Sequence, residues 1–262
     1  YIGFVATSVE MRARSALDIA LWDALGKVTH QPLSVLLGGR IREKIPIYNT
    51  CAGSRYARGP KVGKIENYGI QTPTQTNQYE DLYLFLNDPV GLAGSLLDMG
   101  IDSMKIWPFD FAAKESQGQF ISPSKLKKAL EPFEAIKKEY GDRMQIIAEL
   151  HGEWNLPESL VICHALDEID VRWIEDPIFL TNPSGIKELK RSVRSRIAIG
   201  ETRGGAEDFK SFLDTGALSL LIIDIGWCGG ITEARRCAAL ACLLYTSPSP
   251  RDAHESRMPS SA

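Results

Sequence analysis

The sequence predicts an α/β protein with a parallel sheet, because two kinds of segment alternate along it. Six short apolar runs are separated by amphipathic stretches of helical length between residues 45 and 241. Runs such as Leu220-Leu221-Ile222-Ile223 are apolar at every position, as expected of strands that are covered on both faces. Strands and helices in regular succession favour a parallel sheet, either a doubly wound open sheet or a barrel.

The expected elements follow one another in order. Strands are expected at residues 45–51, 103–107, 144–150, 171–175, 196–201 and 218–225. Helices are expected at 88–99, 123–140, 157–166, 183–193, 206–215 and 231–241. Ahead of them, apolar residues recur at helical spacing from Ala16 to Leu25 after a candidate N-cap at Ser8, and a short helix is expected at 32–37.

Two segments lack this periodicity. Residues 54–81 are rich in Gly, Pro, Thr, Gln and Asn, and we expect a substrate-contacting loop there because long loops in compact domains are usually functional or disordered. The Ser- and Pro-rich end of the chain predicts a disordered, non-native tail over residues 243–262; the alternative is a natural disordered tail. The start at Tyr1, without Met or a signal peptide, is expected to be internal.

Composition excludes several classes of protein. A formal charge of -3, with 44% hydrophobic and 24% charged residues, indicates an ordinary globular chain that binds neither nucleic acid nor an anionic membrane. No apolar run approaches the roughly 20 residues that span a bilayer. The five cysteines form no CxxC pair, so we expect thiols in a reducing compartment and a cytoplasmic protein.

Three glutamates end three successive expected strands. The interval from Glu149 to Glu175 equals that from Glu175 to Glu201, at 26 residues (149 to 175, and 175 to 201). In a barrel, the carboxyl ends of the strands form the active-site face. Converging carboxylates repel one another unless a cation neutralises them, and several hard oxygen ligands favour Mg²⁺. The spacing therefore predicts a Mg²⁺ site; the alternative is that each glutamate caps the following helix.

Further polar residues are expected on the same face. Lys105 lies in an apolar run, where a lysine is unfavourable unless it is paired or faces a wet cavity; the alternative is a snorkelling edge residue. Asp224 is expected to end the sixth strand. His151 follows Glu149 by two residues, so strand alternation directs both to one side; the alternative is a histidine that caps the following helix.

These residues resemble the enolase superfamily, in the branch of mandelate racemase, muconate lactonising enzyme and the acid-sugar dehydratases. Ala16-Leu-Asp-Ile-Ala-Leu-Trp-Asp-Ala-Leu-Gly-Lys and Leu36-Leu-Gly-Gly look like the end of the family's capping domain. Trp173-Ile-Glu-Asp-Pro, Gly200-Glu-Thr and Asp224-Ile-Gly-Trp-Cys-Gly-Gly-Ile-Thr-Glu-Ala look like its fourth, fifth and sixth barrel strands. The resemblance implies an incomplete TIM-type (β/α)7β barrel of about six βα units, preceded by the helical end of an α+β capping domain.

The resemblance also implies roles for the residues that match. Glu149, Glu175 and Glu201 are the implied Mg²⁺ ligands, with glutamate at the first position, where the family usually has aspartate. Lys105 takes the first position of the family's Lys-x-Lys pair. Trp107 occupies the second, which holds a base in the racemases.

Two more residues match acids of the family. His151 resembles the histidine that protonates the departing β-hydroxyl in galactonate and mannonate dehydratases. Asp224 resembles the acid that hydrogen-bonds a histidine base on the seventh strand, and the matching position, Arg251, lies in the expected tail.

The implied function is Mg²⁺-dependent dehydration of a sugar acid. A base removes the proton beside the carboxylate, an enediolate forms, and elimination of water gives a 2-keto-3-deoxy acid. The alternatives are a racemase or epimerase of the same superfamily, which Trp107 disfavours, and a non-catalytic metal-binding relative. We expect the hydro-lyase activity in the parent protein and none in a chain truncated at both ends.

The expected organisation follows from the same resemblance. Residues 1–40 are the expected C-terminal part of the capping domain, 41–242 a partial barrel, and 243–262 the tail. The expected partner is a small sugar-acid substrate, and the parent protein is expected to be a homo-oligomer.

Overall fold

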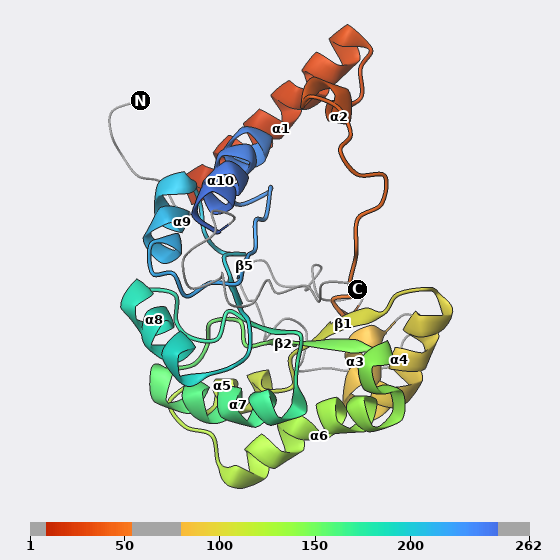
Figure 1. Cartoon of the computed structure of the whole chain (residues 1–262), viewed down its shortest axis with the longest axis vertical. Helices are drawn as coiled ribbons and strands as arrows, with labels where there is room; N and C mark the ends of the chain where they lie inside the picture. Colours follow the sequence, from red (N-terminus) through yellow and green to blue (C-terminus); the bar gives the residue numbers. More distant parts are fainter. Residues whose placement is uncertain (1–8, 54–79, 246–262) are drawn as a thin grey trace, which may run out of the picture. The chain divides into compact units, whose positions relative to one another are not determined.

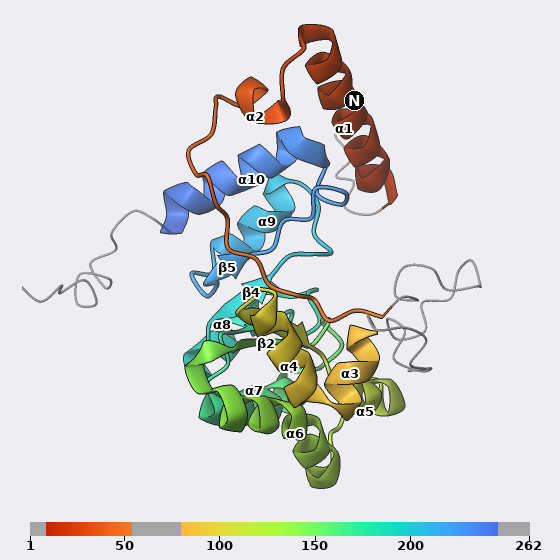
Figure 2. The same cartoon turned by 90° about the vertical axis from the view of Figure 1, so that its right-hand side faces the viewer.

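The computed structural model describes residues 9–53 and 80–245. These residues divide into two compact units (Figures 1 and 2). The sheet unit comprises the described residues of 42–199 and residues 217–220, and the helical unit comprises the described residues of 1–41, 200–216 and 221–262. Within the described ranges, no helix is both long and apolar enough to cross a bilayer.

Five strands form a sheet whose order follows the sequence. They are β1 Ser103–Ile106, β2 Gln145–Glu149, β3 Trp173–Glu175, β4 Ile197–Ile199 and β5 Leu220–Leu221, in the order β1-β2-β3-β4-β5. The pairs β1/β2, β2/β3 and β3/β4 are parallel. A doubly wound sheet reverses its strand order at a switch point, and this one does not, so the architecture is of the barrel type.

The helices of the sheet unit begin with recognisable sequence signals. They are α3 Asp81–Asn87, α4 Pro89–Asp98, α5 Asp110–Ser116, α6 Pro123–Tyr140, the short 3₁₀ helix η2 Gly141–Arg143, α7 Leu156–Ile169 and α8 Pro183–Ser192. Four of them carry proline in the first turn behind an N-cap side chain that accepts a backbone N–H: Asp88, Ser122, Asn155 and Asn182. Packing runs from α3 to α4, then α6, α7 and α8 (Figure 1).

Register divides the side chains of the sheet into two sets. Met104 and Ile146 lie opposite each other, as do Ile106 and Ala148, so one face is entirely apolar and suits the covering helices. The other face carries Lys105 opposite Ile147, and Glu149 opposite Glu175. The charged side chains of these strands therefore lie on the face that points away from the helices.

The helical unit is held together by its first and last described helices. It contains α1 Val9–Thr29, α2 Leu33–Leu36, α9 Ala206–Leu213 and α10 Gly230–Tyr245. Asp18 Oδ2 accepts the backbone N–H of Thr232 at 3.0 Å, in the first turn of α10, where a carboxylate is favourable. A Cβ on Gly230 would lie 2.5 Å from Asp18, so glycine permits this close approach. The Gly-Gly-Ile-Thr part of the sequence motif thus serves helix packing.

All six expected strands are shorter than the sequence predicted, and two of them are reduced the most. The expected strand at 45–51 is reduced to one bridge, between Asn49 and Met104, and Ile45 and Ile47 are exposed. The strand expected at 218–225 contains only Leu220 and Leu221, so Asp224 does not end a strand. Helices α3 and α5 were not predicted, and α10 continues through residues 243–245. Ser8, residues 54–79 and residues 246–262 lie outside the described residues.

Candidate active site

A buried lysine joins two buried glutamates on the polar face of the sheet unit. Lys105 Nζ lies 2.9 Å from Glu149 Oε2 and 2.6 Å from Glu175 Oε1. The lysine side chain is 7% exposed and both glutamate side chains are 0% exposed. Glu149 and Glu175 are the last residues of β2 and β3 and pair with each other in register. The sequence-predicted convergence of these three residues is therefore present.

Each group changes the electrostatics of the others. Burial alone would lower the pKa of Lys105, but the charges of Glu149 and Glu175 raise it above its usual value. Burial and the charge of Glu149 raise the pKa of Glu175. Against the effect of burial, Lys105 lowers the pKa of Glu149. Besides burial, the raised pKa of Glu175 reflects two carboxyl groups held close together, and a divalent cation bound to their oxygens would favour the ionised forms of both.

Aromatic side chains fix the orientation of these groups. Trp173 Nε1 donates to Glu175 Oε2 at 3.1 Å. The Tyr48 ring packs edge-on against Trp173, with centroids 5.5 Å apart, and lies 5.7 Å from Lys105 Nζ. These rings leave the lysine and the glutamate little freedom to separate.

His151 lies beside the glutamates, but for a different reason from the one expected. β2 ends at Glu149, and His151 has a positive φ of 51°, so strand alternation does not direct it. Instead, its backbone N–H donates to Glu149 Oε1 at 2.8 Å. Its ring packs edge-on against Trp107 with centroids 5.6 Å apart. The turn after β2 thus holds the imidazole next to the glutamate.

An aspartate that the sequence analysis missed holds the imidazole. Asp110, at the start of α5, places Oδ2 2.9 Å from His151 Nδ1, and both side chains are buried. Burial raises the pKa of Asp110, although His151 opposes the shift. Burial and then the charge of Asp110 raise the pKa of nearby Glu153 to about 7. No motif distinguished Asp110 or Glu153, because both follow turns whose geometry the sequence did not predict.

Glu201 stands two residues beyond Ile199, the last residue of β4. Two residues of chain span at most about 7 Å, so Glu201 remains close to the carboxyl end of that strand. Within the sheet unit, Glu149 and Glu175 offer two carboxylate oxygens that could bind a metal ion. For Glu149 and Glu175, the two candidate ligand oxygens lie within 4.8 Å of each other.

Asp224 has contacts different from those expected. It is exposed, and its Oδ1 accepts the backbone N–H of Gly226 at 2.7 Å. Its backbone oxygen accepts the N–H groups of Trp227 and Cys228. These bonds shape the turn before α10, which is a common function of aspartate.

The two glutamates fit a hard divalent cation. The donors that Glu149 and Glu175 offer are carboxylate oxygens, and both side chains are fully buried. Mg²⁺ prefers oxygen ligands of this kind. No disulfide joins the five cysteines, and none of them belongs to this group.

Two family profiles match the chain. Residues 90–252 match the family described as "Enolase C-terminal domain-like". Residues 4–38 match the "Mandelate racemase / muconate lactonizing enzyme, N-terminal domain". The first match alone covers more than half of the 262 residues.

Curated relatives include sugar-acid dehydratases. The chain is 27% identical over 228 residues to D-gluconate/D-galactonate dehydratase of Picrophilus torridus, covering 87% of this chain and 50% of the relative. It is 26% identical over 238 residues to D-mannonate dehydratase of Xanthomonas oryzae pv. oryzicola, covering 90% and 54%. The chain thus spans about half the length of the curated relatives it matches.

Solved structures give the same grouping. An enolase protein from Sargasso Sea environmental sequencing superposes with a TM-score of 0.77 at 36% identity, covering 93% of this chain and 57% of that one. An enolase of the mandelate racemase subgroup from Agrobacterium tumefaciens gives 0.75 at 39% identity, covering 92% and 56%. The chain therefore belongs to the enolase superfamily, in its mandelate racemase and muconate lactonising enzyme group.

Proposed function

We propose that the whole protein is a Mg²⁺-dependent acid-sugar dehydratase, a hydro-lyase that forms a 2-keto-3-deoxy acid. The observation that carries this proposal is the buried group of Lys105, Glu149 and Glu175, with His151 held beside it. The dehydratase relatives support the same reaction and a sugar-acid substrate. Because the chain spans about half of those relatives, the activity is assigned to the whole protein.

In this proposal the cation is held by Glu149, Glu175 and Glu201. Bound Mg²⁺ would act as a Lewis acid toward the substrate carboxylate, which makes the adjacent proton easier to remove. The three glutamates supply oxygen ligands, and Trp173 keeps one of them oriented. We also propose that residues 1–40 are the C-terminal part of a capping domain and that residues 41–242 are part of the barrel.

The remaining residues act on the substrate. Lys105 places a positive charge beside the point where the substrate carboxylate gains negative charge, which is a large catalytic effect in a dry site. His151 donates a proton to the departing β-hydroxyl, a contribution on the order of 10²–10⁴ in rate. Asp110 holds Nδ1, so Nε2 is the atom that exchanges this proton.

A racemase needs a base on each face of the substrate. Trp107 stands where the racemases have a second lysine, and its indole N–H cannot accept a proton. Trp107 is also fully buried, between Phe85 and His151. Both points favour elimination over racemisation.

The metal assignment is tested with Glu175→Gln. We expect this variant of the 262-residue chain to bind Mg²⁺ at least about tenfold more weakly in calorimetric titration, and the full-length enzyme to lose nearly all turnover. Glu188→Gln is the control, because Glu188 is exposed on α8. Unchanged Mg²⁺ affinity in Glu175→Gln would refute the assignment.

The role of His151 is tested separately. His151→Asn in the full-length enzyme should abolish dehydration while the α-proton still exchanges in deuterated water. Loss of exchange together with dehydration would make His151 a base or a structural residue.

A further inference from the structure

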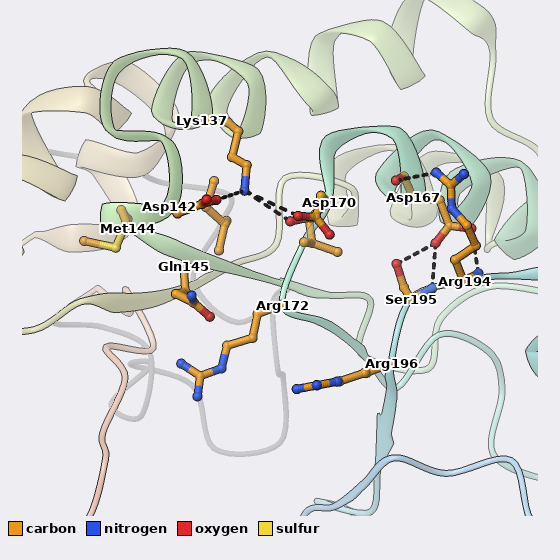
Figure 3. Close-up of a pocket in the computed structure, with 12 residues that line it drawn as sticks. Lys137, Asp142, Met144, Gln145, Asp167, Asp170, Arg172, Arg194, Ser195 and Arg196 are labelled. Carbon is orange, nitrogen blue, oxygen red and sulfur yellow. Dashed lines mark hydrogen bonds and ion pairs between the residues drawn. The ribbon is translucent and has the colours of Figure 1, made fainter. Parts of the chain in front are cut away.

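A charged cavity opens at the amino ends of β2, β3 and β4, the opposite end of these strands from the glutamates (Figure 3). Its volume is about 320 Å³. Gln145, the first residue of β2, lines it, together with Arg172 and Arg196 just before β3 and β4. The strands of the sheet separate this cavity from the proposed active site.

The acidic side chains of the cavity are already bound within the protein. Asp142 and Asp170 lie 3.1 Å and 3.8 Å from Lys137 Nζ. Asp167 Oδ1 accepts Ser195 Oγ at 2.6 Å, and Asp167 Oδ2 accepts the backbone N–H of Arg194 at 2.9 Å. Although burial opposes it, the Ser195 hydroxyl and the two backbone N–H groups lower the pKa of Asp167, so this carboxylate stays ionised.

Two of the basic side chains are bound in the same way. Lys137 holds the two aspartates, and Arg194 Nη2 donates to Asp167 O and Glu168 Oε1, each at 2.9 Å. Figure 3 shows the contacts of Lys137 with Asp142 and Asp170, and those of Arg194 and Ser195 with Asp167. They hold the wall of the cavity in place without a ligand.

Arg172 and Arg196 remain. Arg172 Nη1 donates to Ser103 Oγ at 2.7 Å, and its guanidinium lies 5.4 Å from the Trp173 ring centroid, which positions it while leaving other N–H groups for a ligand. Arg196 is exposed, and among the described residues its side chain has no ion pair or hydrogen bond. In Figure 3 both side chains extend in the same direction, away from the ion pairs of Lys137 and Arg194. Two positive charges therefore face the cavity without an acidic partner.

We propose that this cavity binds the phosphate group of a small molecule between Arg172 and Arg196. Guanidinium groups offer paired N–H donors that match the oxygens of phosphate, and they remain charged at every physiological pH. The proposed phosphate site and the proposed binding site of the substrate carboxylate lie at opposite ends of the strands, so the two ligands do not compete.

The proposal is tested on the 262-residue chain by calorimetric titration with inorganic phosphate and with glycerol 3-phosphate. The buffer contains physiological salt, because screening removes weak surface attraction. We expect saturable binding, reduced at least about tenfold in Arg196→Ala, and reduced less in Arg172→Lys, which keeps the charge but loses the planar fork. Arg191→Ala is the control, because Arg191 is exposed on α8 and does not line the cavity.

The outcomes distinguish a phosphoester ligand from free phosphate, and they distinguish specific binding from non-specific attraction. Tighter binding of glycerol 3-phosphate would favour a phosphoester, and equal or tighter binding of inorganic phosphate would favour the free ion; both support the site. No saturable binding below about 10 mM would overturn the proposal. Equal losses in Arg191→Ala and Arg196→Ala would also overturn it, as non-specific attraction. Circular dichroism melting confirms that the exposed substitution leaves the fold intact.

Discussion

Replacing Lys105 with Met removes the positive charge between two buried carboxylates. At an effective dielectric constant of 20, unit charges 4 Å apart interact by about 4 kcal/mol, and Lys105 makes two contacts shorter than that. Loss of one partner from a buried ion pair destabilises proteins by about 3–5 kcal/mol. We expect Lys105→Met to lower the unfolding free energy at pH 7 by a similar amount, because the buried carboxyl groups of Glu149 and Glu175 would lose the positive charge that they share.

The assay is thermal or urea unfolding, with and without Mg²⁺. For a chain of this size, about 1 kcal/mol shifts the Tm by roughly 2–4 °C, so the expected loss is on the order of 10 °C. Mg²⁺ should bind the variant at least about tenfold more tightly, since the ammonium no longer competes for the same oxygens. Stability and metal affinity should therefore move in opposite directions.

Lys27→Met is the matched control. Lys27 Nζ lies 2.6 Å from Asp23 Oδ2, the same distance as in the Lys105–Glu175 pair, but its side chain is 76% exposed. Exposed pairs contribute about 0–1 kcal/mol. Equal Tm losses in the two variants, or an unchanged Tm in Lys105→Met, would contradict the burial argument.

Three further predictions follow from individual contacts. Asp110→Asn in the full-length enzyme should lower kcat for dehydration by about 10²-fold with little change in KM, because Nδ1 of His151 loses its charged partner; a change in KM alone would contradict this. The pKa of Glu153 is raised from its ordinary 4.5 to about 7, so the protonated carboxyl group favours the folded state, and stability is lost as the pH rises through this range. Glu153→Gln should remove about 1–2 kcal/mol of this loss, allowing for solvent screening, as measured by urea unfolding from pH 5 to 8. Gly200→Ala should destabilise by more than about 2 kcal/mol, since a Cβ there would lie 2.5 Å from a backbone oxygen, whereas Gly216→Ala meets nothing within 4 Å and should lose only about 1 kcal/mol.

The lysine and two of the glutamates were predictable because parallel strands repeat one geometry. Glu149 and Glu175 hold the same position in successive strand–helix units, and the structure pairs them in register. Lys105 lies two rows below them, opposite Ile147, on the same face. A charged residue in an otherwise apolar strand needs a partner, and the adjacent strands supply it.

Asp110 and Glu153 were not predictable from the same pattern. Asp110 begins α5, a helix of seven residues whose sequence lacks an amphipathic repeat long enough to detect. Contact between Asp110 and His151 also depends on the positive φ of His151. From sequence alone, a positive φ is expected at Gly or Asn more readily than at His. Loop geometry, not strand periodicity, determines this half of the site.

Glu201 illustrates the limit of periodic reasoning. Ala198 pairs with Glu175, so residues 198 and 200 belong to the polar face, and regular alternation would turn residue 201 to the apolar face. Gly200 has φ +132°, a conformation that residues with a Cβ rarely adopt, and it interrupts the alternation immediately before Glu201. The equal spacing of the three glutamates predicts Glu201 as a ligand, whereas the alternation of β4 alone would not, because Gly200 changes the direction of the chain before Glu201. A search for such sites by sequence should weigh the Gly-Glu dipeptide together with the spacing.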